Sequence, residues 1–221
     1  MIHSGELLAQ AQLPTEARLA EEWRAARMTV RHALALLEQE GLIYRRHGVG
    51  TFVSEPKLVQ NATLLRGFFE QALGQGLFPQ STIVRKGERS ADAHLSGYMK
   101  VAPGSTNLEV VRLRSARGVP VVVEHSYFPA GTFPGLLAHD LEHRSIYRLM
   151  DEEYSGRPTS ATQTIEIAEA DAENGRLLGV ALHTPLMRVE RVAHGPAGDI
   201  REYAEDFYRG DQVRFVTNLK L

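Results

Sequence analysis

RMTVRHALALLEQEG (residues 27–41) and LIYRRHGVGTFV (residues 42–53) are the adjoining stretches that decide the fold of the N-terminal part. In the first stretch the apolar residues recur at helical spacing, which predicts a helix over Arg27–Glu40. Gly41 is well placed to end this helix, because glycine adopts the left-handed conformation without a steric penalty. In the second stretch two short strands flank the turn at 47–50, which predicts a hairpin.

The residues before residue 27 predict another helix. Leu13-Pro14-Thr15-Glu16 reads as a helix start, because Thr15 can cap free backbone N–H groups and Glu16 is favourable at the positive helix end. We expect this helix to run to about Trp23 and a short break over 24–26 to follow. Helix, tight turn, helix and hairpin, in that order, are the layout of a winged helix-turn-helix.

The composition is that of a globular protein and gives no bulk support to nucleic-acid binding. Of 221 residues 43% are hydrophobic and 24% charged, and the net charge is −2. The basic charge is local, since five arginines but only two acids lie between residues 24 and 53. The absence of cysteine excludes disulfides and thiolate metal sites, and we expect no metal or cofactor. No signal peptide and no apolar run near the roughly 18 residues of a membrane helix are visible, so we expect a cytoplasmic protein.

The sequence pattern changes beyond Glu55-Pro56-Lys57, which interrupts the strand pattern. Turns between strand pairs favour an antiparallel α+β sheet, and no internal repeat is visible. We assign 1–54 to the winged helix, 55–62 to a linker and 63–221 to a second domain. In that domain we expect helices near 65–73, 91–98, 145–153 and 171–178, and strands near 81–89, 107–117, 119–128, 159–168, 185–194 and 200–217.

Residues 4–54 resemble the DNA-binding domain of the GntR family of transcriptional regulators in order and spacing. This resemblance implies an operator-binding protein that acts as a homodimer on palindromic double-stranded DNA, and a regulator and not an enzyme. The residues that carry it are Leu13-Pro14-Thr15-Glu16, Leu19-Ala20-Glu21-Glu22, Arg27-Met28-Thr29-Val30-Arg31, Ala33-Leu34, Leu36-Leu37-Glu38, Glu40-Gly41-Leu42-Ile43 and Arg45 through Val53.

The second helix is expected to present its first turn to the major groove. Arginine can bond a guanine edge in bidentate fashion there, and each such pair contributes roughly 1–3 kcal/mol of discrimination. Arginines at the base of the hairpin suit phosphate oxygens, and the hairpin tip can enter the minor groove. The residues expected to contact DNA are Thr15, Arg18, Arg27, Met28, Thr29, Arg31, Arg45, Arg46, His47 and Gly48.

Three positions depart from the GntR pattern. The family carries glycine in the turn where this chain has Arg24 or Ala25, and a serine where it has Ala26. Ala17 stands where the family has an arginine, so one DNA contact is absent unless Arg18 supplies it. In addition, the family's first helix would end near 2–5, so we expect a truncated first helix. These departures keep open a sensor whose DNA-binding domain no longer binds.

Residues 63–221 resemble the UTRA effector-binding domain of the HutC-type GntR subfamily. The resemblance implies a six-stranded antiparallel sheet with helices, related in fold to chorismate lyase, and usually a homodimer. The residues that carry it are Val111-Arg112-Leu113-Arg114, Pro120 through Pro129, Ser145-Ile146-Tyr147, Glu202 and Tyr208-Arg209-Gly210-Asp211.

Arg112 and Arg114 are two apart in a predicted strand and so point to one face, where they would hold an anion between them. In the family the positions of Arg112, Arg114, Ser145 and Tyr147 hold the anionic end of the effector. Those of Glu124, Glu202 and Tyr208 face its polar remainder. Arg66-Gly67 replaces a serine/threonine pair that often binds phosphate, and Arg66 can itself bind an anion. We therefore expect a small anionic effector of the sugar phosphate, carboxylate or phosphonate class.

Other interpretations remain beside the regulator. The two arginines can form surface ion pairs with nearby acids, and with Glu124 they can serve lyase-like chemistry on a carboxylated substrate. His139-Asp140-Leu141-Glu142-His143 fits a metalloprotease pattern, which we interpret as a solvated polar stretch. The pairs Glu88 with Asp92, and Glu205 with Asp206, are interpreted as solvated charges.

Overall fold

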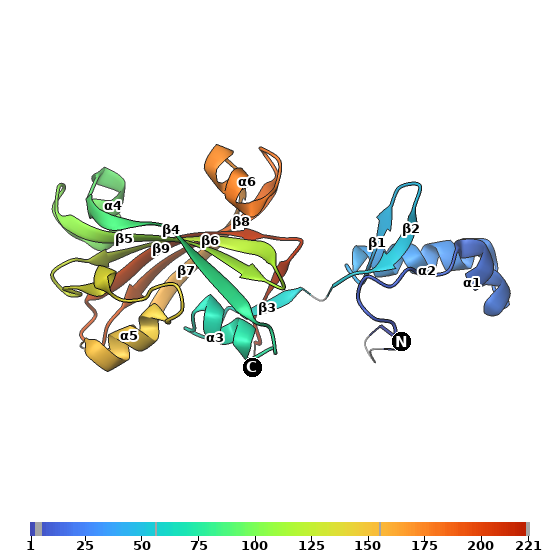
Figure 1. Cartoon of the computed structure of the whole chain (residues 1–221), viewed down its shortest axis with the longest axis horizontal. Helices are drawn as coiled ribbons and strands as arrows, with labels where there is room; N and C mark the ends of the chain where they lie inside the picture. The colour runs from blue at the N-terminus through green and yellow to red at the C-terminus, as the bar shows by residue number, and fades with distance from the viewer. Residues whose placement is uncertain (3–5, 56, 155, 220–221) are drawn as a thin grey trace. The chain divides into compact units, whose positions relative to one another are not determined.

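The structure is a computed structural model that describes residues 1–2, 6–55, 57–154 and 156–219. It divides into two compact units, Met1–Lys57 and Leu58–Leu221. Figure 1 shows both units. Each has its own buried apolar core.

The first unit is the predicted helix-turn-helix with a hairpin. Thr15 caps the first helix by accepting a hydrogen bond from the backbone N–H of Arg18 at 3.3 Å, and Gly41 ends the second with φ +72°. Leu19 and Val30 are buried in the core of this unit. The elements are α1 (Glu16–Glu22), α2 (Arg27–Gln39), β1 (Ile43–Arg46) and β2 (Gly50–Val53).

The turn between α1 and α2 shows the departures seen in the sequence. Arg24 adopts the left-handed conformation with φ +51°, a conformation that costs a non-glycine residue roughly 1–2 kcal/mol. Ala26 occupies the N-cap of α2, and its side chain makes no capping hydrogen bond. The expected truncated first helix falls partly on residues 3–5, outside the described residues. In the part that is described, no helix or strand precedes α1.

The second unit is built on a six-stranded antiparallel sheet with strand order β4-β5-β6-β9-β8-β7. In Figure 1, α3 and α5 lie on one face of this sheet and α4 and α6 on the other. This confirms the expected α+β class and the six antiparallel strands. The elements are β3 (Leu58–Asn61), α3 (Phe68–Leu73), β4 (Pro79–Ser90), α4 (Ala93–Met99), β5 (Thr106–Ala116), β6 (Val119–Pro129), a 3-10 turn (Leu136–Ala138), α5 (Ile146–Glu153), β7 (Ser160–Glu169), α6 (Ala172–Leu178), β8 (Pro185–His194), β9 (Ile200–Arg209) and β10 (Val213–Val216).

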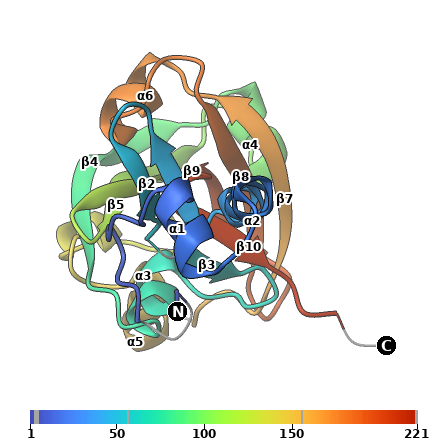
Figure 2. The same ribbon diagram turned by 90° about the vertical axis from the view of Figure 1, so that its right-hand side faces the viewer.

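The last predicted strand, 200–217, is wrong as a single element. The chain turns after Arg209, and β10 leaves the main sheet to pair in parallel with β3 (Figure 2). Because β3 covers 58–61, half of the segment assigned to the linker is a paired strand of the second unit. The boundary between the units falls at Lys57 and Leu58.

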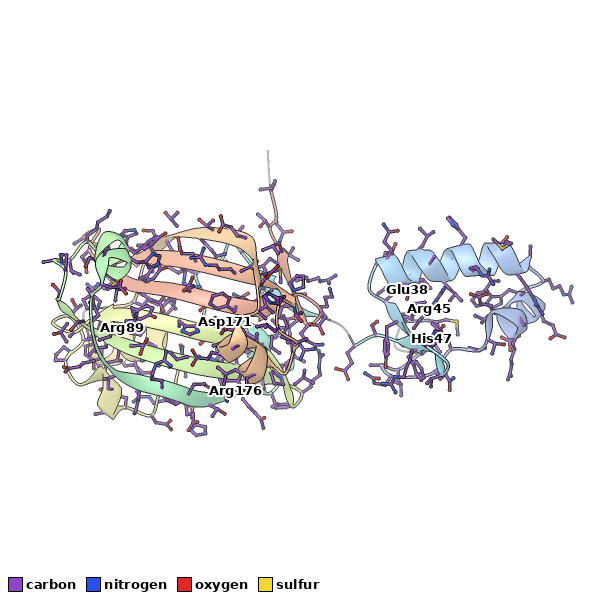
Figure 3. All side chains as sticks on the ribbon, turned by 90° about the horizontal axis from the view of Figure 1, so that it is seen from above. Glu38, Arg45, His47, Arg89, Asp171 and Arg176 are labelled. Atoms are coloured by element: carbon purple, nitrogen blue, oxygen red, sulfur yellow. The ribbon has the colours of Figure 1, made fainter. Side chains whose placement is uncertain are left out.

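The second unit also contains an internal duplication, which corrects the expectation of no repeat. The order α3-β4-α4-β5-β6 recurs as α5-β7-α6-β8-β9, and the halves meet where β6 pairs with β9. Asp92 and Asp171 cap α4 and α6 in the same way, each accepting a hydrogen bond from the backbone N–H three residues on (Figure 3 labels Asp171). The next residues repeat as well: Asp92-Ala93 and Val101-Ala102 return as Asp171-Ala172 and Val180-Ala181.

Candidate nucleic-acid interface and ligand cavity

The residues predicted to contact DNA are all exposed on the first unit. They lie at the start of α1, on the first turns of α2 and on the β1–β2 hairpin. The second helix and the hairpin are the elements that contact DNA in a winged helix. Met28 is an exposed apolar side chain in this set and is available for contact with a thymine methyl group.

Several of these arginines form ion pairs within the unit. Arg31 pairs with Glu16 at 3.0 Å. Arg45, on the same hairpin as His47, lies 3.3 Å from Glu38 of α2 (Figure 3). Such exposed pairs are worth at most about 1 kcal/mol, so a phosphate can replace the carboxylate. For Arg27 no acidic partner lies within ion-pair distance in the described part of the chain, which leaves its guanidinium available to a base.

A polar cavity of about 60 Å³ lies in the second unit and is lined by residues of α3, α5 and the main sheet. Every residue predicted to bind the effector lines it, from Arg66 before α3 to Tyr208 on β9. Other polar residues that line it are Gln60, Asn61, Gln71, Ser126, Gln163, Arg191 and Asp206.

The anion expected between Arg112 and Arg114 is supplied by the protein itself. Glu124 lies directly opposite Arg112 on the next strand. Its Oε2 forms an ion pair with Arg112 Nη2 at 2.9 Å and accepts a hydrogen bond from Arg114 Nε at 2.8 Å. All three side chains are buried, so this is not the surface ion pair that the sequence left open. Burial raises the pKa of Glu124, but the two arginines outweigh it and hold that pKa below its usual value.

Arg112 remains able to bind a further acceptor. Burial and the neighbouring Arg114 lower its pKa to about 10, which leaves it charged at neutral pH. Its Nη1 donates weakly to the carbonyl of Leu141 at 3.4 Å, and its Nε has no partner among the described residues. Arg112 Nε is therefore a buried donor that the described residues leave unpaired even while Glu124 is in place.

Tyr147, Glu202 and Arg191 form a second buried group in the cavity. The Tyr147 hydroxyl donates to Glu202 Oε2 at 2.5 Å, and Arg191 Nε lies 3.5 Å from the same oxygen. Sequence reasoning missed Arg191. The duplication identifies Arg191 as the counterpart of Arg112, because each is the seventh residue of its strand, β8 and β5 respectively.

The interpretation of Glu205 and Asp206 as solvated charges is wrong for Asp206. Glu205 pairs with Arg188 on the face of α4 and α6, whereas Asp206 is buried and lines the cavity. Burial raises the pKa of Asp206 to about 8, with Glu124 and Glu202 acting in the same direction against Arg191. Strand alternation from Glu202 and Tyr208 places Asp206 on their face and could have revealed it.

Segments at the cavity rim hold Arg66 and Ser145. Ser145 caps α5, accepting from the backbone N–H of Arg148 at 3.4 Å, and Arg66 is exposed just before α3. The His139–His143 stretch does not converge on one point: His143 pairs with Asp140, and His139 lies 3.3 Å from Glu153. No three metal-ligating side chains come together in the described ranges.

Comparisons with known proteins agree with this architecture. The sequence matches the family described as bacterial regulatory proteins, gntR family, over residues 1–53 and the UTRA domain over residues 74–214. The HTH-type transcriptional repressor NagR of Bacillus subtilis (strain 168) is 34% identical over 216 residues, 97% of this chain and 88% of that protein. The HTH-type transcriptional repressor PhnF of Mycolicibacterium smegmatis is 32% identical, over 92% of this chain and 82% of its own.

A solved structure is similar over both units. The crystal structure of PhnF from Mycobacterium smegmatis matches with a TM-score of 0.77 and 30% identity, covering 97% of this chain and 94% of that chain. A winged helix joined to an effector-binding domain defines a ligand-responsive class of transcriptional regulators. The chain belongs to the GntR family and carries a UTRA domain.

Family membership confirms the expected regulatory role over the lyase-like alternative. It assigns DNA binding to the first unit and small-molecule binding to the second. In the part of the chain that the structure describes, no helix is long and apolar enough to cross a membrane.

Proposed function

We propose that this protein is a transcriptional repressor that binds a palindromic operator as a homodimer and is released by a small anionic metabolite. The observation that carries the proposal is the buried cavity, in which every predicted effector residue comes together. Arg112, Arg114 and Arg191 bring three guanidiniums into it beside the carboxylates, and Arg66 adds a fourth guanidinium at the rim. Buried guanidiniums with free donors favour a carboxylate, phosphate or phosphonate.

Two-fold symmetry supports the palindrome, because a symmetric dimer of winged helices places its recognition helices on half-sites about 34 Å apart. The similar proteins NagR and PhnF are both named repressors, which supports repression over activation.

The proposal is tested with the duplex from the gene's own upstream region and a screen of carboxylates, phosphates and phosphonates. We expect at least one class to release the duplex, measured by fluorescence anisotropy. Arg112→Ala is expected to lose this response while its ligand-free DNA affinity stays within a few-fold of wild type. Arg27→Ala is expected to lose DNA affinity while it still binds the anion.

Arg89→Ala is the matched control for Arg112→Ala. Arg89 is an arginine of the same sheet, but it pairs with Glu109 on the opposite face (Figure 3). Its removal should leave both the DNA affinity and the anion response unchanged. If Arg112→Ala instead abolishes DNA binding, Arg112 is structural, and if no anion class releases the duplex, the effector proposal fails.

A further inference from the structure

Three buried polar atoms in the cavity have no hydrogen-bond partner among the described residues. They are the donors Gln60 Nε2 and Arg112 Nε, and the acceptor Asp206 Oδ1. Their residues are 3%, 6% and 1% exposed, and all three line the cavity. Buried polar atoms in native proteins are nearly always paired, so a set of unpaired atoms around one cavity indicates groups that a ligand completes.

Asp206 differs from the other two carboxylates of the cavity. Glu124 accepts a hydrogen bond from Arg114 and forms an ion pair with Arg112. Glu202 accepts hydrogen bonds from Tyr147 and Arg191. Asp206 accepts no such hydrogen bond from the described residues: Arg191 Nη1 lies 3.6 Å from its Oδ2, beyond hydrogen-bond distance. Asp206 lines the cavity, and its buried Oδ1 has no donor from the described residues.

The position of Asp206 in the sheet explains why the protein leaves it unpaired. Its cross-strand neighbours are Glu124 on β6 and Val189 on β8. One neighbour is a carboxylate already bound to arginines, and the other has no polar side-chain atom. Neither directly opposite residue offers a donor, and the guanidinium of Arg191 on β8 lies nearest to the other carboxylate oxygen, so a ligand in the cavity is the donor that Oδ1 lacks.

We propose that Asp206 determines the specificity of this cavity by accepting a hydrogen bond from a hydroxyl or amino group that the anionic effector carries. This inference rests on the proposed function and names the class of its ligand: an anion that also bears a hydrogen-bond donor. Gln60 Nε2 and Arg112 Nε bind the acceptor atoms of the same molecule. An anion without a donor leaves Asp206 Oδ1 buried and unpaired, and it binds about tenfold or more weakly for that reason.

The test compares three small phosphates of similar size by isothermal titration calorimetry on the full chain. Propyl phosphate carries only the anion, glycerol 3-phosphate adds hydroxyl groups, and phosphoethanolamine adds an amino group. We expect the wild-type protein to bind glycerol 3-phosphate, phosphoethanolamine or both at least tenfold more tightly than propyl phosphate.

Two substitutions of Asp206 test whether this residue causes the preference. Asp206→Ala removes the acceptor and is expected to make the three affinities equal. Asp206→Asn keeps one acceptor oxygen in place, so it should retain part of the wild-type preference that Asp206→Ala loses. Glu205→Gln is the matched control, because it neutralises the neighbouring residue of β9 on the opposite face, and it should leave every preference unchanged.

The outcomes separate this inference from the proposed function. If the wild-type protein binds all three phosphates with equal affinity, or if Asp206→Ala keeps the wild-type preference, the role of Asp206 is overturned and the anion site stands. If none of the three binds, the anion site itself is overturned and the inference falls with it.

Discussion

Buried charge is concentrated in the second unit, where Arg112, Glu124 and Asp206 stand side by side on β5, β6 and β9. Spacing within one strand predicts that Arg112 and Arg114 share a face, and it does so correctly. The identity of the anion between them depends on which residue of the next strand lies opposite. That register is set by the hairpin at Arg117-Gly118 and is not readable from a single strand.

At this scale the pKa of Asp206 gives a prediction for stability against pH. The folded protein keeps the proton of Asp206 up to about pH 8, whereas an unfolded chain releases it near pH 4. The unfolded state therefore binds fewer protons between these values, and wild-type stability falls as pH rises through this window. The asparagine in Asp206→Asn does not titrate. The melting temperature of this variant minus that of wild type should therefore increase from pH 4 to pH 8.

Melting curves at several pH values measure this difference. A stability gain of 1 kcal/mol corresponds to about 2–4 °C in a chain of this length. Glu205→Gln serves as the control and should show no comparable trend. A constant difference between Asp206→Asn and wild type across the whole range would show that Asp206 is already ionised in the folded protein.

At the scale of elements, the sequence predicts nearly every helix and strand within a few residues. The periodicity of α2 and the turn residues around β1 and β2 are strong local signals. The failures have a common physical cause. The short strands β3 and β10 are strands because they pair with each other, although most of the sequence of the second unit lies between them. Local sequence patterns carry no information on such distant pairing.

The turn between α1 and α2 supports a prediction about the first unit. Arg24→Gly relieves the left-handed backbone strain, roughly 1–2 kcal/mol, and Ala26→Ser adds a capping hydrogen bond worth about 1 kcal/mol. The double variant should melt several degrees higher in this unit. Trp23, the one tryptophan of the chain, lies at the end of α1, so its fluorescence reports the melting of this unit.

Arg24→Ala combined with Ala26→Ser is the control for the double variant, because alanine keeps the positive-φ strain while it removes the guanidinium. Equal melting of the glycine and alanine variants would show that the turn stores no strain. Restored stability together with unchanged DNA affinity would also argue against a damaged DNA-binding domain.

Two glutamines bind β3, the first strand of the second unit. The side-chain amide of Gln75 makes two hydrogen bonds with the backbone of Val59, at 2.9 and 2.7 Å. Gln71, which lines the cavity, accepts from the N–H of Asn61 at 2.7 Å and donates to the carbonyl of Arg66 at 3.2 Å. These bonds fix β3 to α3, immediately after the boundary between the units.

Gln75 does not line the cavity, so its substitution tests this connection without altering the ligand site. We expect Gln75→Ala to keep anion affinity and ligand-free DNA affinity within about two-fold of wild type, while it weakens the release of DNA by the anion. Gln75→Glu keeps the bond from the Val59 N–H and should retain part of the response. A full response in Gln75→Ala would show that coupling takes another route.

At the scale of the whole molecule, the two units divide binding between them, each with its own core. The sequence predicts this division, because the hairpin signals end where Glu55-Pro56-Lys57 begins. It does not reveal the duplication in the second unit, since few residues are identical between the halves. The duplication becomes visible when Arg112 and Arg191 enter one cavity from matching strands.

The most direct test of the central claim is fluorescence anisotropy of the full chain on the duplex from its own upstream region, beside a scrambled duplex, across a salt series. A regulator of this kind should bind the first duplex more tightly, and its affinity should fall steeply with salt as phosphate contacts release counterions. Equal binding to both duplexes, or none, would contradict an operator-binding role and leave the second unit as the working part of the protein.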